Sequence, residues 1–284
     1  MVDVNYQLEG ANGDVIVFDT ENFVLNTGIS GFGIPPTAVR IEDSAGDGGV
    51  WRHTKRSVRD VDLPITVFGA NRDEVQAKLR RLGTLLQDGL GAPKLRAVYD
   101  NGDELYLEVH YVGGGETLID NNAAGQTWCR WVISLRAPNP YWRSGIEESF
   151  SISTGYTGRG LLPELTKLKV SSSTALGVVT VVNAGDVITY PVWNLTGPVE
   201  NLVISNGTLS FTFPVIYAGQ TITVNTETST VVDQDGVNRY DYLGPAPKFF
   251  SLPPGTTGIS VLGINADTNF NATLTYSPRY EVVH

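Results

Sequence analysis

The sequence predicts a mainly β protein of two domains, with one helix confined to the first domain. Short alternating runs of apolar residues, separated by Gly, Pro and Asn, fill most of the 284 residues. Only one segment has apolar residues at helical spacing. Charge density falls near residue 145, because residues 1–145 carry 33 charged side chains and residues 146–284 carry 17. We therefore expect an N-terminal α+β domain, residues 1–145, and a C-terminal β-sandwich, residues 146–284.

The predicted boundary lies in the segment SLRAPNPYWRSG. An alternating run stops at Pro138, and Tyr141 and Trp142 follow a second proline. Prolines next to a Ser/Gly end are typical of a boundary between domains. We interpret Tyr141 and Trp142 as residues of the domain seam, with one face of each ring buried. An exposed binding platform within a single domain is the alternative interpretation.

The predicted helix, about residues 71–88, has signals for its start and its end. Asn71 can cap the N-terminus, Glu74 can complete a capping box, and Gly89 fits the position after the last turn. The apolar residues of this segment share one helical face: Val75, Leu79, Leu82, Leu85 and Leu86. Antiparallel strands are predicted around the helix in RDVDLPITVFG, in TWCRWVISLRAP and in KLRAVYDNGDELYLEVHYV, where Asn101 and Gly102 indicate a hairpin turn.

The second half contains no helical pattern. Eight short segments have the composition of strands: VVTVV, ITYPVWNLTG, NLVIS, LSFTF, QTITVNT, STVVD, GISVLGI and ATLTYS. Turn residues separate them, including Asn-Gly, Asp-Gly and Pro-Pro-Gly. Eight strands without a helix predict a β-sandwich or a jelly roll.

Composition argues against several classes of chemistry. A net charge of −10 disfavours nonspecific binding to nucleic acid. The three histidines (His53, His110 and His284) and the single Cys129 supply neither a zinc site nor a nucleophile–base pair, and the phase of Cys129 predicts a core thiol. DQDG, residues 233–236, is interpreted as a hairpin turn, with a calcium loop as the alternative. We expect no catalytic residue, no cofactor and no metal, so the protein is not predicted to be an enzyme.

Neither a secretory signal nor an apolar run long enough to span a bilayer is visible. We therefore expect a protein that is made in a cytoplasm and does not associate with a membrane.

The order of the motifs points to a family. LPITVFG, the capped segment NRDEVQAKLRRLGTLL, the hairpin and WCRWVISLRAPNPYW are followed by NAGDVITYPVWNLTGP, FFSLPPGTTGISV and ATLTYSPRY. This ordered set resembles the distal tail proteins of long-tailed, non-contractile phages, in the version common in phages and prophages of actinobacteria. The resemblance covers essentially the whole chain, although no single motif is diagnostic.

The resemblance implies a structural role in the virion. Members of this family form a six-fold ring at the tail tip, which joins the tail tube protein to the tail-tip or baseplate hub. Its channel lets the tape measure and then DNA pass without specific binding. The N-terminal domain builds the ring, and the C-terminal domain is a galectin-like sandwich. Residues 146–284 leave no room for the inserted sugar-binding module of some members.

Within this family assignment, the segment EDSAGDGGVWRHTKRSVRD is a candidate subunit interface. It is too polar for a core and too charged for a tight turn. We interpret it as an arm that orders against the neighbouring subunit, with Trp51 as a buried anchor; a solvated loop is the alternative. The interface candidates are Trp51, Arg52, Lys55, Arg56 and Arg59.

A second function is compatible with the same composition. A β-sandwich can be a carbohydrate-binding module or a glycan-cleaving enzyme, with paired carboxylates that sequence spacing cannot locate. Trp193, Tyr217 and Tyr242 are the aromatic candidates for sugar stacking, although each also suits a core position. A ring with a central hole would distinguish the tail protein from this alternative.

Overall fold

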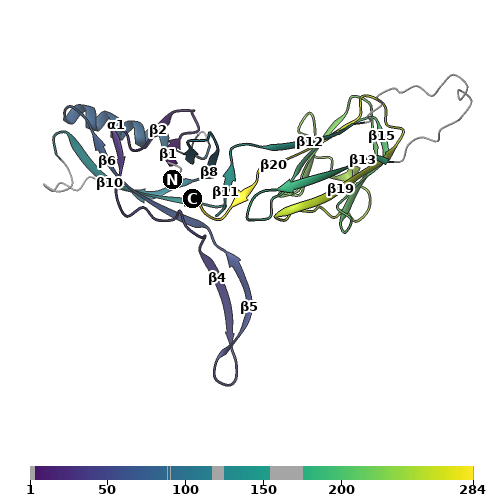
Figure 1. Cartoon of the computed structure of the whole chain (residues 1–284), viewed down its shortest axis with the longest axis horizontal. Helices are drawn as coiled ribbons and strands as arrows, with labels where there is room; N and C mark the ends of the chain where they lie inside the picture. The colour runs from purple at the N-terminus through teal and green to yellow at the C-terminus, as the bar shows by residue number, and fades with distance from the viewer. Residues whose placement is uncertain (1–3, 88, 90, 117–124, 154–174, 284) are drawn as a thin grey trace, which may run out of the picture. The chain divides into compact units, whose positions relative to one another are not determined.

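The computed structural model describes residues 4–87, 89, 91–116, 125–153 and 175–283, and the chain divides into two compact units (Figure 1). Unit 1 comprises Met1–Ile146 and Arg279–His284, and unit 2 comprises Glu147–Pro278. The prediction of a mainly β fold with antiparallel sheets is confirmed. The sequence analysis assigned residues 279–284 to the second domain, whereas the structure places them in unit 1.

Apart from a two-stranded arm, unit 1 is built from two sheets and the helix α1 (Arg72–Leu85). The first sheet has the strand order β2 (Val15–Val17), β1 (Val4–Glu9), β7 (Lys94–Tyr99), β8 (Glu104–Glu108), β11 (Trp142–Ser144) and β21 (Arg279–Tyr280). The second has the order β3 (Phe23–Leu25), β6 (Arg59–Phe68), β10 (Trp128–Ala137) and β9 (His110–Gly114). Apolar side chains from both sheets and from α1 form one buried core.

The helix begins as its sequence predicts but ends earlier. The side chain of Asn71 accepts a hydrogen bond from the backbone N–H of Glu74 at 3.0 Å. The Glu74 carboxylate accepts from the N–H of Ala70, one residue before the cap, rather than from Asn71 itself. The last turn closes where the N–H of Leu86 donates to the carbonyl of Leu82. The predicted end at residue 88 is therefore wrong, and Gly89 lies beyond the cap.

Unit 2 is a sandwich of two antiparallel sheets. One has the order β12 (Glu148–Ser153), β20 (Asn271–Tyr276), β14 (Val192–Thr196), β17 (Thr221–Asn225) and β18 (Thr230–Asp233). The other has the order β13 (Ala175–Asn183), β19 (Gly255–Ile264), β15 (Val199–Ser205) and β16 (Ser210–Ile216), and the short 3₁₀ helix η3 (Tyr240–Tyr242) follows β18. Each of the eight predicted segments contributes one strand, and β12 is an additional strand.

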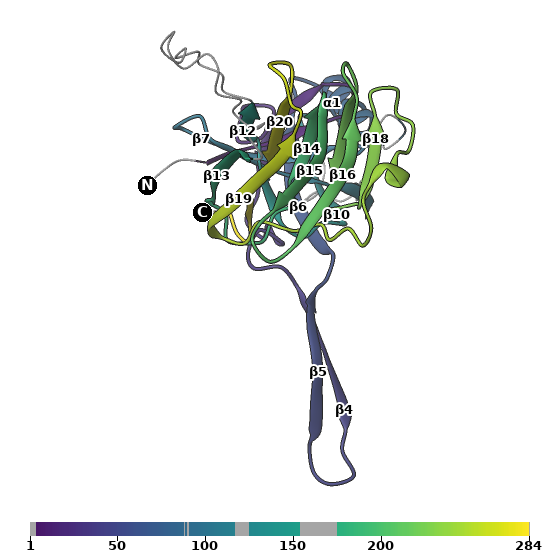
Figure 2. The same cartoon turned by 90° about the vertical axis from the view of Figure 1, so that its right-hand side faces the viewer.

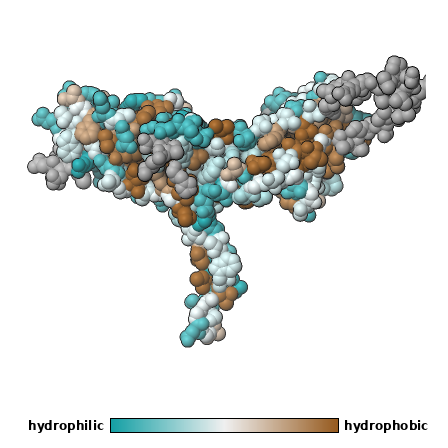
Figure 3. All heavy atoms as spheres, viewed as in Figure 1, coloured by the Kyte–Doolittle hydropathy of each residue, from teal (hydrophilic) through white to brown (hydrophobic). Residues whose placement is uncertain are grey.

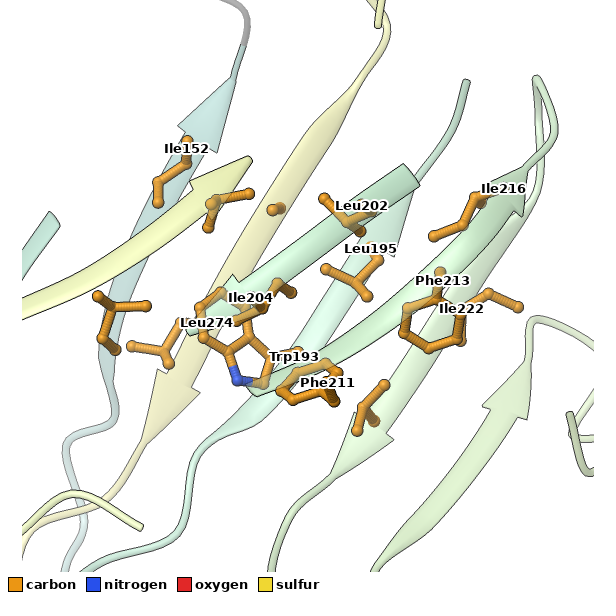
Figure 4. Packing of buried hydrophobic residues seen from close by; sticks show 14 of the residues in the cluster. Ile152, Trp193, Leu195, Leu202, Ile204, Phe211, Phe213, Ile216, Ile222 and Leu274 are labelled. Atoms are coloured by element: carbon orange, nitrogen blue, oxygen red, sulfur yellow. The ribbon is translucent and has the colours of Figure 1, made fainter. Parts of the chain in front are cut away.

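The core of unit 2 is centred on Trp193, which comes from β14 and points between the two sheets (Figure 4). Its side chain is 0% exposed, and its ring meets that of Phe211 on the opposite sheet edge-on, with centroids 6.4 Å apart. Leu195, Ile204 and Leu274 belong to the same buried cluster. Such a ring has no room to reorient, because protein interiors are packed as densely as organic crystals.

Replacing Trp193 with alanine should destabilise unit 2 selectively. The cavity left by an indole costs about 3–5 kcal/mol. We expect calorimetry to show two transitions in the wild-type chain and a lowered melting temperature for only one of them in Trp193→Ala. Tyr217→Ala is the control, since the Tyr217 side chain is 68% exposed. A single transition that shifts as a whole would contradict two independently folding domains.

A buried carboxylate organises the turn after β18. One oxygen of Asp233 accepts hydrogen bonds from the backbone N–H groups of Asp235, at 3.0 Å, and Val237, at 2.9 Å. The other accepts from Nε of Arg239 at 2.7 Å. Burial by itself would raise the pKa of Asp233, but these donors outweigh burial and hold the pKa below its ordinary value of 3.8. The carboxylate is thus surrounded by donors, which favours the turn interpretation of DQDG over a calcium loop.

The Asp233 carboxylate should make the stability of unit 2 depend on acid pH. A pKa that is lower in the folded state contributes stability above the ordinary pKa, and this stability is lost as pH falls through the folded value. Asp233→Asn should therefore lower the melting temperature at pH 7, and its difference from wild type should shrink between about pH 5 and pH 2. Asp186→Asn, at an exposed position, is the control. Thermal melts across this range measure the effect, and a difference that is constant with pH would contradict the assignment.

Candidate subunit interface

A two-stranded arm extends from unit 1 between β3 and β6. Its strands, β4 (Thr37–Asp43) and β5 (Gly49–Arg56), pair with each other and form a sheet of their own. Figures 1 and 2 both show this hairpin standing clear of the sheets of unit 1. The segment predicted as an arm or a solvated loop is therefore a hairpin whose register shifts once, between Arg40 and Ile41, and its first strand, TAVRIED, was not predicted.

The arm has an apolar face. Ile41 lies directly opposite Trp51, and Val39 lies opposite Thr54. The indole N–H of Trp51 donates to the hydroxyl of Thr54 at 2.8 Å, which holds the ring on this face. Val39, Ile41 and Trp51 are 54%, 61% and 62% exposed, and Figure 3 shows apolar residues along the arm. Exposed apolar side chains grouped in this way are typical of an interaction surface.

The opposite face of the arm is ionic. Glu42 accepts hydrogen bonds from Arg40 at 3.3 Å and from Arg52 at 2.7 Å. Lys55 lies opposite Ala38 and His53 lies opposite Arg40, so both belong to this polar side. Three of the predicted interface residues, Trp51, Arg52 and Lys55, are thus exposed on the arm but on different faces. The division into an apolar and an ionic face suits a hairpin that is covered on one side only.

Arg56 is located at the base of the arm. Its guanidinium donates to the hydroxyl of Thr37 and to the carboxylate of Glu281, each at 2.5 Å. Its side chain is about one third exposed. Arg56 therefore joins both strands of the arm to the chain segment that follows β21.

Arg59 is not a surface residue. It was predicted as an interface residue, but within the subunit its side chain is buried and cannot contact a neighbour. Its side chain is 1% exposed. Nε donates to the carbonyl of Pro140 at 2.6 Å, and Nη2 donates to the carbonyl of Glu281 at 2.7 Å. Nη1 donates to the carbonyls of Gly31 and Gly33 at 2.5 and 2.7 Å. Burial lowers the pKa of Arg59 to about 10, with Glu281 opposing the shift, so the group stays charged at neutral pH.

The two aromatics predicted for the domain seam differ in burial. Trp142 is 0% exposed and belongs to the core of unit 1, where its ring lies edge-on to Phe32 with centroids 5.6 Å apart. Tyr141 is half-buried. The full burial of Trp142 corrects the expectation of one exposed face. Its cause is the pairing of β11 with both β8 and β21, which places Trp142 inside a continuous sheet.

The histidines, the cysteine and the carboxylates are the residue types that catalyse reactions or bind metals in other proteins. Here they either make structural contacts or are scattered over different elements. His53 lies on the arm, His110 begins β9, and His284 lies outside the described residues. Cys129 is 0% exposed, as its phase predicts. The carboxylates of Glu9 and Glu104 both bind Arg96. In the described part of the chain, no group of three or more His, Cys, Asp or Glu side chains could hold a metal ion.

The aromatic candidates for sugar binding do not form a platform. Trp193 is enclosed in the core, Tyr242 is half-buried next to Arg239, and Tyr217 is exposed in a different loop. Among the described helices, none is long and apolar enough to cross a membrane.

Known proteins confirm the resemblance seen in the sequence. Residues 184–280 match the family described as the siphovirus-type tail component, C-terminal domain. The crystal structure of the Dit protein (gp 19.1) of phage SPP1, described as a hub adsorption apparatus of phages infecting Gram-positive bacteria, is similar over 96% of this chain and 98% of that chain, with a TM-score of 0.65 and 14% identity. No curated protein matches the chain in sequence.

Baseplate structures show the same fold. A chain of the phage P2 baseplate in its activated conformation with Ca matches with a TM-score of 0.57 and 12% identity, over 99% of this chain and 100% of that chain. The corresponding baseplate with Sr gives a TM-score of 0.56, 12% identity and the same coverage. At these identities the similarity shows a common fold across both units, and the family match identifies the C-terminal domain. Residues 184–280 are therefore similar to the C-terminal domain of siphovirus-type tail components, and the chain as a whole shares the fold of the SPP1 Dit protein.

Proposed function

We propose that this chain is a distal tail protein that forms a six-fold ring at the tail tip. The ring joins the tail tube to the baseplate or tail-tip hub, and its channel lets the tape measure and DNA pass. The observation that carries the proposal is the amphipathic arm, whose apolar face is uncovered within the subunit. The baseplate and hub proteins that share the fold support the same role.

The arm suits a contact between identical subunits. We infer that the body of a neighbouring unit 1 covers the arm, so that the two surfaces in contact differ. A contact between two different patches is heterologous, and identical heterologous contacts close into a ring when the rotation between subunits allows it. Trp51 is then the anchor of each contact, because large aromatic side chains account for much of the binding energy of protein interfaces.

The charge of the chain is consistent with a channel for DNA. Its 30 acidic and 20 basic side chains give a net charge of −10. A polyanion passing through a ring of negatively charged subunits meets few of the Lys and Arg contacts that hold DNA in place. The composition is therefore compatible with passage without specific binding.

Imaging of the purified chain tests the proposal. Negative-stain micrographs should show rings with six-fold symmetry and a central hole, and light scattering should give the mass of six chains. A protein that stays monomeric at every soluble concentration would overturn the ring.

Trp51→Ala should prevent ring formation without unfolding the subunit. Loss of a hot-spot aromatic costs on the order of 2–4 kcal/mol per contact, and a closed ring repeats the loss at every contact. We expect gel filtration with light scattering to show monomers and thermal melts to match wild type, because the Trp51 side chain packs against little of its own subunit. Tyr217→Ala is the matched control, since it removes another exposed aromatic and should leave the rings intact. Rings that survive Trp51→Ala would place the subunit contacts on the sheets and helix of unit 1 instead.

A further inference from the structure

We propose that the chain segment after β21 positions the arm, with Arg56, Arg59 and Glu281 as the positioning residues. We call these three residues the clasp. The inference rests on the proposed function, because it explains how the arm is aimed at a neighbouring subunit. It also makes ring assembly depend on Glu281, which lies near the opposite end of the sequence from the arm.

The contacts of the clasp converge at the point where the arm leaves unit 1. The backbone of Glu281 accepts from Arg59, and its carboxylate accepts from Arg56. Arg56 ends β5, and Arg59 begins β6, so the two arginines lie on either side of the exit from the arm. On the entry side, the carbonyls of Gly31 and Gly33 accept from Arg59. Both ends of the arm are thus attached to Glu281, in the segment that follows β21.

The base controls where the rest of the arm points. The arm strands pair only with each other, so the direction of the hairpin is set where it joins unit 1. Trp51 lies five residues from Arg56, or about 17 Å along an extended strand. A rotation of about 10° at the base would move Trp51 by about 3 Å. An anchoring side chain displaced by that much no longer fits a packed pocket on a partner.

The clasp also meets both connections between the units. The carbonyl of Pro140, which precedes β11, accepts from Nε of Arg59, and the carbonyl of Glu281, which follows β21, accepts from Nη2. The chain leaves unit 1 for unit 2 after β11 and returns to it at β21. The Arg59 guanidinium thus binds the backbone close to both connections.

The pair of Arg56 and Glu281 allows the clasp to be tested without disrupting the core. Both side chains are about 30% exposed, and ion pairs of this kind contribute little to the stability of a fold. Arg59, by contrast, is buried, and its loss would leave four carbonyls without their donor. Reversing the charge of Arg56 or of Glu281 should therefore alter the position of the arm while each subunit stays folded.

The position of the arm can be measured in the separated subunit. Spin labels at Gly46→Cys, at the tip of the arm, and at Ala77→Cys, on the exposed side of α1, report one distance within unit 1. Cys129 is buried and should not be labelled. We expect a narrow distance distribution in the otherwise unchanged chain and a broad one after Arg56→Glu or Glu281→Arg. The double variant Arg56→Glu/Glu281→Arg should restore most of the narrow distribution, because it rebuilds the ion pair with the charges exchanged.

Ring assembly supplies the second measurement. Each single reversal should weaken a subunit contact about twofold, which multiplies to roughly 60-fold over the six contacts of the ring. Arg81→Glu is the matched control: it breaks the exposed ion pair with Asp14, away from the arm, leaves the base untouched and should keep the distance narrow. Unchanged distances in both single reversals would overturn the clasp. A wild-type chain that forms no ring would overturn the proposed function instead, and the distances would still decide whether the clasp positions the arm.

Discussion

The structure of unit 1 depends on the buried guanidinium of Arg59. The guanidinium of Arg59 donates hydrogen bonds to four backbone carbonyls, which come from the entry to the arm, the approach to β11 and the segment after β21. A charge removed from water is tolerated only when its donors are satisfied, and the planar fork of arginine can reach several carbonyls at once. Lysine has three donors at one point and could not replace it. The backbone at Gly31 lies close to the backbone at Asp60. A Cβ atom at Gly31 would lie 2.1 Å from the carbonyl oxygen of Asp60.

Fixing the base leaves the arm itself incomplete. A two-stranded hairpin has no core of its own and is only marginally stable in water. Here one face is held together by the bonds of Glu42 to two arginines, while the other exposes Val39, Ile41 and Trp51. The arm therefore combines a rigid attachment with an unsatisfied surface. This combination is expected of an element whose folding is completed by assembly rather than within the subunit.

Sequence patterns predicted the elements that depend on local signals. Asn71 marked the helix, and alternation located the eight strands of unit 2 and the buried Cys129. The sequence pattern did not predict strand β4, which pairs only with β5 within the arm. It also did not predict the full burial of Trp142, which depends on the pairing of β11 with β21, a strand far away in the sequence. Arg59 looked like one of several surface bases in RHTKRSVR. A signal for its burial was present, however, since Arg59 has the same phase as Val61, Leu63 and Ile65, which all face the core.

Several charged groups of the described chain are used to build structure. Asp233 is surrounded by the donors of its own turn, Glu9 and Glu104 share Arg96, and the Arg59 guanidinium is filled by carbonyls. Each of these charged groups could react or bind a ligand only if its hydrogen-bond partners were removed. Removing those partners would disrupt the local fold. The exposed apolar face of the arm has no such partner in the subunit. The proposed ring would use this division, with charges fixed inside each subunit and apolar surface left for the contact between subunits.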